Sequence, residues 1–138
     1  MRLQNVSRVV FGILFVGMGV THFLREDLFL RIMPPYLPAP TVLNRVAGFF
    51  EILGGLGVQM PDPLIRRVAG WGCVALLLAV YVVNIDMALH GSPLRDGTLV
   101  PGGNAALWAR LPLQFVFIAW ALSISRPARG HYEAGAKM

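Results

Sequence analysis

The chain has 138 residues, of which 56% are hydrophobic and 14% are charged. Soluble domains carry about 25% charged residues, so this composition is typical of a membrane protein, and the length fits one domain. The formal net charge of +5 comes from 12 basic and 7 acidic residues, but the arginines flank apolar runs and form no basic patch, which argues against nucleic-acid partners.

Four segments are long and apolar enough to cross a lipid bilayer. A span needs about 20 mainly apolar residues, and a helix satisfies all its backbone amides without water. We therefore predict an all-α polytopic membrane protein, a four-transmembrane-helix bundle forming a single membrane domain over residues 1–138, in which residues 126–138 are a flexible C-terminal tail. The predicted helices cover residues 6–24, 42–60, 68–89 and 107–125.

The segments between these helices carry their own signals. The first helix lacks a small-x-small cleavage site, so we expect it to be retained rather than removed as a signal peptide. In residues 25–40, the stretch DLFLRIM is amphipathic enough to lie at the membrane interface, whereas the prolines that follow prevent a regular helix. Residues 60–67 predict a tight turn, and residues 90–104, rich in glycine and proline, predict a surface loop.

Lysine and arginine are distributed unequally between the two sides of this bundle. Seven lie on the side of the termini (Arg2, Arg8, Arg66, Arg67, Arg126, Arg129 and Lys137) and five on the other (Arg25, Arg31, Arg45, Arg95 and Arg110), which accounts for all 12. Cytoplasmic loops carry the excess of basic residues, so this bias favours cytoplasmic termini and two longer loops outside.

Polar residues at membrane depth fall on one side of the predicted bundle. Because odd helices run outward and even helices run inward, all of them lie in the outer half: His22, Arg45, Glu51, Asn84, Asp86, Arg110 and Gln114. This one-sided distribution indicates a hydrated or hydrogen-bonded pocket that opens outward. The candidate ligand-binding residues are His22, Glu51, Asn84, Arg45 and Gln114, and the sequence identifies no catalytic residue.

Glu51 lies within the apolar stretch FFEILGGLG. A carboxylate that faced lipid would cost about 2.5 to 3.5 kcal/mol on insertion scales, so we expect Glu51 to be paired with His22 or Arg45, or to be protonated. Helical spacing places it on a stripe with Gly48 and Gly55, where helices approach closely. Two roles stay open for Glu51: a structural hydrogen bond between helices, or binding of a ligand or proton.

Other polar residues have simpler interpretations. Asp86 and His90 are four residues apart, a spacing compatible with a metal, but a helix end reaching the headgroups explains them better, and we predict no metal site. Arg45 fits an interface anchor as well as a pocket residue. The single cysteine, Cys73, excludes an internal disulfide or dithiol pair and fits a small core residue.

Three stretches of the sequence resemble the DoxX-like family of small bacterial membrane proteins. They are GVTHFLREDLFLRIMPPYLPAP, GFFEILGGLGVQMP and VVNIDMALH, and the resemblance extends from about residue 9 to 126. It implies a four-helix bundle in the bacterial cytoplasmic (inner) membrane. The family takes its name from a subunit of a thiosulfate:quinone oxidoreductase, and His22, Glu51 and Asn84 match positions that recur in such proteins.

Three functions remain open from the sequence. The first is a membrane subunit of a quinone-linked redox system, with a bound quinone and membrane or peripheral redox partner proteins. The second is a non-catalytic assembly or interaction protein, and the third a small-solute binder or transporter, for which four helices would require a homo-dimer. The chain shows no cofactor site of its own, since it lacks paired haem histidines, a cysteine cluster and a dinucleotide fingerprint.

Overall fold

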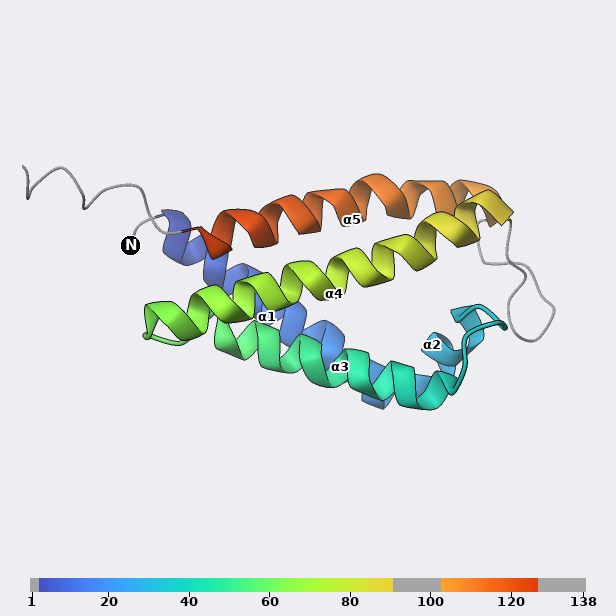
Figure 1. Ribbon diagram of the computed structural model, residues 1–138, viewed down its shortest axis with the longest axis horizontal. Helices are drawn as coiled ribbons and strands as arrows, with labels where there is room; N and C mark the ends of the chain where they lie inside the picture. Colours follow the sequence, from blue (N-terminus) through green and yellow to red (C-terminus); the bar gives the residue numbers. More distant parts are fainter. Residues whose placement is uncertain (1–2, 91–102, 127–138) are drawn as a thin grey trace, which may run out of the picture.

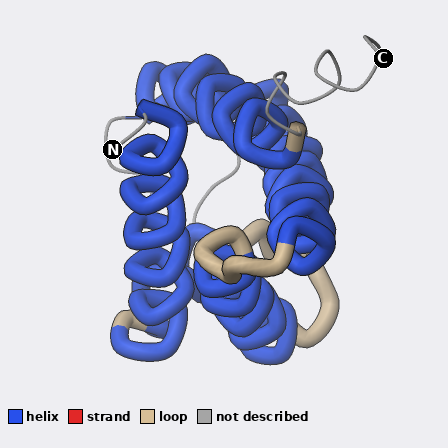
Figure 2. The backbone as a smooth tube through the Cα atoms, turned by 90° about the vertical axis from the view of Figure 1, so that its left-hand side faces the viewer, coloured by secondary structure: helices blue, strands red, loops and turns tan. Residues whose placement is uncertain are grey.

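The computed structural model describes residues 3–90 and 103–126, and within them every regular element is a helix (Figures 1 and 2). The elements are α1 (Leu3–Leu24), α2 (Glu26–Ile32), α3 (Pro40–Gly57), α4 (Pro63–His90) and α5 (Gly103–Ser125). The all-α prediction is confirmed. The central part of the predicted surface loop, residues 91–102, and residues 127–138 of the predicted tail lie outside the described residues.

Within the described residues, three helices are long and apolar enough to cross a membrane: Leu3–Leu24, Pro63–His90 and Ala105–Ser125. They correspond to the first, third and fourth predicted spans. The second predicted span, residues 42–60, differs, because α3 begins at Pro40 and ends at Gly57. With 18 residues that include Asn44, Arg45 and Glu51, α3 is not one of the three apolar helices.

Local chemistry explains where these helices begin. Both α3 and α4 start with a proline, whose missing N–H costs nothing in the first turn of a helix. Before α4, the Asp62 carboxylate accepts hydrogen bonds from the backbone N–H groups of Leu64 at 2.7 Å and Ile65 at 3.1 Å, which satisfies two donors that lack partners inside the helix. The tight turn predicted over residues 60–67 is therefore a capped helix start.

The long helices pack as two antiparallel pairs (Figure 1). The first pair is α1 with α3, the second is α4 with α5, and α3 and α4 join the pairs. Glycines bring α1 and α3 together: a Cβ built on Gly19 would lie 2.6 Å from the Gly48 carbonyl oxygen, and one built on Gly55 would lie 2.8 Å from the Gly12 carbonyl oxygen. Small residues of this kind allow helices to approach closely within lipid.

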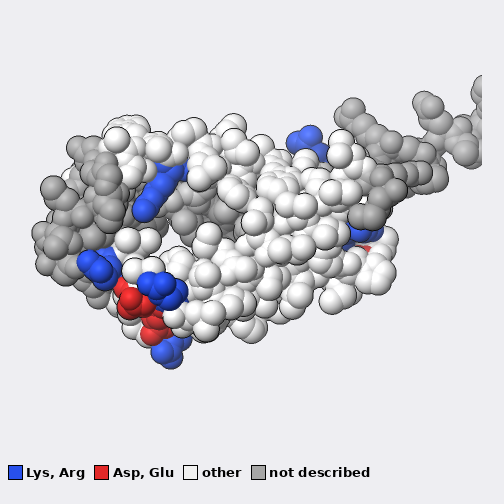
Figure 3. Space-filling view, turned by 180° about the vertical axis from the view of Figure 1, so that it is seen from behind, with Lys and Arg blue, Asp and Glu red and all other residues white. Residues whose placement is uncertain are grey.

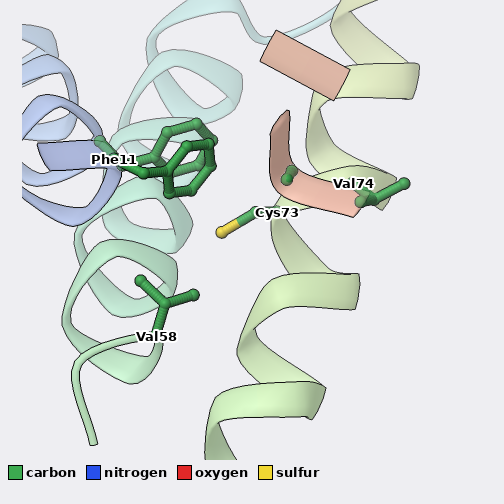
Figure 4. Close-up of a cluster of buried hydrophobic side chains, with 6 residues drawn as sticks. Phe11, Val58, Cys73 and Val74 are labelled. Atoms are coloured by element: carbon green, nitrogen blue, oxygen red, sulfur yellow. The ribbon is translucent and has the colours of Figure 1, made fainter. Parts of the chain in front are cut away.

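Two buried apolar clusters connect the pairs. The larger one lies toward the end of the bundle where α3 meets α4, and there Cys73 of α4 points between Phe11 of α1 and Val58 (Figure 4). The smaller one lies toward the opposite end, where Met87 and Ala88 of α4 contact Leu107 of α5 and the partly buried Ile32 of α2 packs against them. The prediction that Cys73 is a core residue is confirmed, with 1% exposure.

The surface of the bundle is mostly apolar. On the face shown in Figure 3, charged side chains gather toward the two ends of the molecule and leave an uncharged band between them. Large apolar side chains such as Ile13, Leu53, Val82 and Phe115 are exposed in this structure. A band of exposed apolar side chains with charges at its edges is compatible with contact with a lipid bilayer.

Candidate functional site

The polar side chains predicted at membrane depth lie toward one end of the bundle. At that end α1 and α4 finish and α3 and α5 begin, and α2 lies beside the start of α3 (Figure 1). Along each long helix, the polar groups follow the residues of the larger apolar cluster toward this end. On α4 and α5, the Asn84–Gln114 pair lies between the larger cluster and the smaller cluster around Met87. The candidate site is therefore in the half of the bundle that holds α2.

His22, near the end of α1, is fixed by Asn44 in the second turn of α3. The His22 Nδ1 atom lies 2.7 Å from the Asn44 Oδ1 atom, and the Asn44 Nδ2 group donates a hydrogen bond to the His22 backbone carbonyl at 2.8 Å. Asn44 is fully buried and His22 is 9% exposed. Asn44 thus caps a carbonyl in the last turn of α1, where no partner exists within the helix, and holds the imidazole in place.

The other ring nitrogen of His22 faces Glu51. The Nε2 atom lies 3.4 Å from the Glu51 Oε2 atom, and both side chains are nearly buried. This Oε2 atom has no hydrogen-bond partner among the described residues, since a 3.4 Å separation is long for a well-formed bond. We call His22 and Glu51 the dyad. It is an acid–base pair in contact, and its Glu51 Oε2 atom is free to accept or donate a further hydrogen bond according to its protonation.

A glycine makes room for this dyad. A Cβ built on Gly48 would lie 2.6 Å from the His22 Cβ atom, so the imidazole sits directly over Gly48. Asn44, Gly48 and Glu51 follow one another at helical spacings of four and three residues, which puts them on one face of α3. The ring of Phe29 in α2 stacks on the opposite side of His22, with centroids 3.8 Å apart. The imidazole is thus enclosed by α1, α2 and α3.

Arg45 does not pair with Glu51. Its guanidinium forms a two-pronged ion pair with Glu26 of α2, at 2.9 Å and 3.2 Å. The hydrogen bond from Arg45 holds the pKa of the Glu26 carboxyl below its usual range. The sequence suggested either His22 or Arg45 for Glu51, and the structure brings only His22 to it. Arg45 instead ties α2 to α3 beside the dyad.

Asn84 and Gln114 form a second polar pair, on α4 and α5. The Asn84 side-chain amide donates to the Gln114 side-chain carbonyl, and the Gln114 amide donates to the Leu77 backbone carbonyl at 2.9 Å. Among the described residues, no hydrogen bond or ion pair joins this pair to His22 or Glu51. The two helix pairs are thus each crosslinked by polar side chains, the first by Asn44 and the dyad, the second by Gln114.

Asp86 contacts both the segment after α2 and His90 on its own helix. The Tyr36 hydroxyl donates to Asp86 at 2.5 Å, and the His90 Nδ1 atom lies 3.0 Å from the Asp86 carboxylate. The hydrogen bond to Asp86 raises the pKa of the Tyr36 hydroxyl. Within residues 3–90 and 103–126, no group of three or more potential metal ligands comes together.

Asn44, Glu26 and Phe29 are the residues that sequence reasoning missed around the dyad. The stripe Gly48, Glu51 and Gly55 was visible in the sequence, and extending it by one turn toward the start of α3 reaches Asn44. The partnership with His22 depends on how α1 and α3 align, which no local pattern states. Phe49 and Phe50 lie away from the site, since both are 53% exposed and contact each other edge to face.

Comparison with known proteins identifies the family of this chain. A family model described as "Domain of unknown function (DUF8561)" matches residues 11–125, so the chain belongs to that family. The matched region includes the dyad, Asn44 and the Asn84–Gln114 pair. No curated protein and no solved structure matches the sequence.

Proposed function

We propose that this member of the DUF8561 family is a four-span protein of the bacterial cytoplasmic membrane that binds the headgroup of a quinone and serves a quinone-linked redox system. The observation that carries the proposal is the contact between His22 and Glu51, a buried acid–base pair with an unpaired carboxylate oxygen. Ionisable groups at membrane depth mark ligand or proton sites by default. The resemblance to DoxX-like proteins supports the choice of a quinone.

The fourth span in this proposal is α3. Its 18 residues extend about 27 Å at 1.5 Å per residue, close to the thickness of a hydrocarbon core of about 30 Å. Its polar residues Asn44 and Glu51 are turned toward α1, whereas its other faces expose only apolar side chains in the central turns: Val46, Phe49, Phe50, Leu53 and Leu56. The low overall hydropathy of α3 therefore comes from its buried polar face together with the exposed Arg45 in its second turn.

The number of spans determines where the termini lie. Four spans place both termini on the same side of the membrane, which the distribution of lysine and arginine makes the cytoplasmic side, whereas three spans place them on opposite sides. Epitope tags at the two ends, probed with protease on intact and on permeabilised cells, distinguish the two cases. We expect both tags to be protected until the inner membrane is opened; protection of only one tag would contradict the four-span arrangement.

A quinone suits the dyad chemically. Its carbonyl oxygens accept hydrogen bonds, and whichever of His22 Nε2 and Glu51 carries the proton can donate one. Its isoprenoid tail would extend into the surrounding lipid, along the exposed apolar faces of the helices. No electron transfer within this chain is part of the proposal, because redox partner proteins would supply it.

The test is chemical identification of what the protein retains. The protein is purified in mild detergent and extracted with organic solvent, and quinone is quantified per mole of protein for the wild type, Glu51→Gln and the control Asp27→Asn. Asp27 carries an exposed carboxylate on α2, so its substitution makes the same chemical change away from the dyad. We expect quinone in the wild type and the control and at least about a tenfold loss in Glu51→Gln.

The absence of quinone from the wild type would overturn the proposed function and favour the non-catalytic assembly or interaction protein. In that case Glu51 would serve the packing of α1 on α3, and proteins that co-purify would be unaffected by Glu51→Gln. Equal quinone content in Glu51→Gln and the wild type would place the quinone elsewhere on the bundle.

A further inference from the structure

The buried side chain of Asn44 has contacts that determine which of its ends faces His22. Its nitrogen end donates to the His22 backbone carbonyl at 2.8 Å, and a carbonyl oxygen cannot donate a hydrogen bond in return. The oxygen end is thereby left facing the His22 Nδ1 atom at 2.7 Å. An amide oxygen only accepts hydrogen bonds, so the Nδ1 atom must carry a proton.

This constraint determines the protons of the dyad. With a proton fixed on Nδ1, the Nε2 atom of a neutral imidazole is an acceptor, and it faces an oxygen of Glu51 at 3.4 Å. Two acceptors facing each other in a buried site repel, whereas a proton on either one removes the repulsion; because 3.4 Å is long for a hydrogen bond, that proton stays available to a ligand. The pair then consists either of a neutral imidazole with a carboxylic acid or of an imidazolium with a carboxylate, and both forms have a net charge of zero.

The charges around the dyad also cancel. Glu26 of α2 is paired with Arg45 of α3, and Phe29 of α2 and the buried Cys73 of α4 contribute no charge. Among the described side chains that contact the dyad, Asn44 and Phe29 carry no charge that could pair with a charged ligand, and an unpaired charge is strongly disfavoured in a buried, low-dielectric site.

We infer that Asn44 is a specificity-determining residue, which makes His22 and Glu51 a one-proton dyad and restricts its ligand to an uncharged amphiphile with a hydrogen-bond-accepting carbonyl. This inference deepens the proposed function and rests on it for the choice of a quinone. It adds that the dyad selects its ligand by the charge of the ligand, and that Asn44 sets this selection without needing to touch the ligand.

The first experiment compares ligands that share one alkyl tail. The probes are a benzoquinone, a neutral N-methyl fatty amide, a fatty acid anion and an alkylammonium cation, and their binding to the full-length protein is measured calorimetrically in nanodiscs of neutral lipid. We expect the wild type to bind both neutral carbonyl probes at least about tenfold more tightly than either charged probe. Equal binding of a charged probe would overturn the inference.

The second experiment changes Asn44. Asn44→Asp adds a negative charge beside His22 without changing the size of the side chain, and we expect the preference to move from the neutral probes to the alkylammonium cation. Asn5→Asp is the matched control, because Asn5 is an exposed asparagine in the first turn of α1, at the opposite end of that helix from His22; it should leave the preference unchanged. A folded Asn44→Asp variant with the preference of the wild type would overturn the inference.

An infrared measurement keeps the inference testable if Asn44→Asp does not fold. The difference spectrum between the wild type and Glu51→Gln should contain either the C=O stretch of one protonated carboxylic acid or imidazolium bands from His22 together with a carboxylate band. The bands of a carboxylate beside a neutral imidazole would contradict a shared proton.

The two proposals fail on different results. If the purified wild type lacks quinone yet prefers the neutral amide, the proposed function fails while the one-proton dyad stands. If the wild type retains quinone but binds charged probes equally, the proposed function stands and the inference about the dyad fails.

Discussion

Gly19 of α1 and Gly48 of α3 lie in direct backbone contact, one turn from the dyad. A Cβ built on Gly19 would lie 2.6 Å from the Gly48 carbonyl oxygen, and one built on Gly48 would lie 2.6 Å from the His22 Cβ atom. Real Cβ atoms do not approach other atoms so closely, so a side chain at either position must separate the helices. This contact sets the distance at which His22 meets both Asn44 and Glu51.

We therefore predict that Gly48→Ala loosens the site. Overpacking a tight contact costs about 1 to 3 kcal/mol in free energy of unfolding, more than the gain of about 1 kcal/mol from replacing glycine with alanine in a helix. The measurement is thermal unfolding followed by the reaction of Cys73 with a fluorogenic thiol reagent, because the only cysteine in the chain is buried until the bundle opens.

The control for this prediction is Gly17→Ala on α1. No atom lies within 4 Å of a Cβ built on Gly17, so this variant should be as stable as the wild type or slightly more stable. Equal stability of Gly48→Ala and Gly17→Ala would show that the glycine contact between α1 and α3 does not set their separation.

The Asn84–Gln114 pair is predicted to stabilise the second helix pair modestly. Gln114 links Asn84 to the Leu77 carbonyl, so Gln114→Leu removes two hydrogen bonds at once. Side-chain hydrogen bonds between membrane helices contribute about 0.6 kcal/mol on average and up to about 1.7 kcal/mol. A double-mutant cycle of Gln114→Leu and Asn84→Ala should give a coupling energy in that range, and strict additivity of the two substitutions would contradict it.

Acid should weaken the attachment of α2 to α3. Because the hydrogen bond from Arg45 lowers the pKa of Glu26 in the folded protein, this carboxylate stabilises the fold above its unfolded pKa, and the contribution is lost as the pH falls through its lowered folded pKa. The melting temperature of the wild type should therefore decrease more in mild acid than that of Glu26→Gln. Parallel pH profiles for the two proteins would count against this ion pair as a stabilising contact.

High pH should weaken the contact between Tyr36 and Asp86, just as low pH weakens the contact between Glu26 and Arg45. Its pKa is raised because its hydroxyl donates to Asp86, so its stabilising contribution is complete below the unfolded pKa and is lost as the pH rises through the folded pKa. Ultraviolet titration of tyrosinate formation, with Tyr36→Phe to assign the signal, should show Tyr36 ionising at lower pH in Asp86→Asn than in the wild type. An unchanged titration would indicate that the link between Tyr36 and α4 does not form in solution.

The sequence by itself determined the elements of this protein. Apolar runs, the prolines at the starts of α3 and α4, and the glycines of α1 and α3 are local signals, and they predicted the long helices and the packing stripe through Glu51. The turn that they predicted over residues 60–67 lies a few residues earlier, between Gly57 and Pro63. They also placed the polar residues in one half of the bundle, because a chain that reverses at every turn alternates direction. The four-span count extended beyond these signals, since Asn44, Arg45 and Glu51 lower the hydropathy of α3 and it is not one of the three apolar helices.

Only the tertiary structure decided which polar groups meet. Arg45 and His22 were both candidate partners for the Glu51 carboxylate. Helical periodicity predicts which face of a helix each residue lies on, but not which residue of another helix it contacts. The register of α1 against α3, fixed by glycine contacts one and two turns away, brings His22 between Asn44 and Glu51 and leaves Arg45 to Glu26. Hydrogen bonds form over about 3 Å, so a shift of one residue along a helix changes every such partner. Side-chain pairing between helices is therefore a property of the folded bundle, which no single segment specifies.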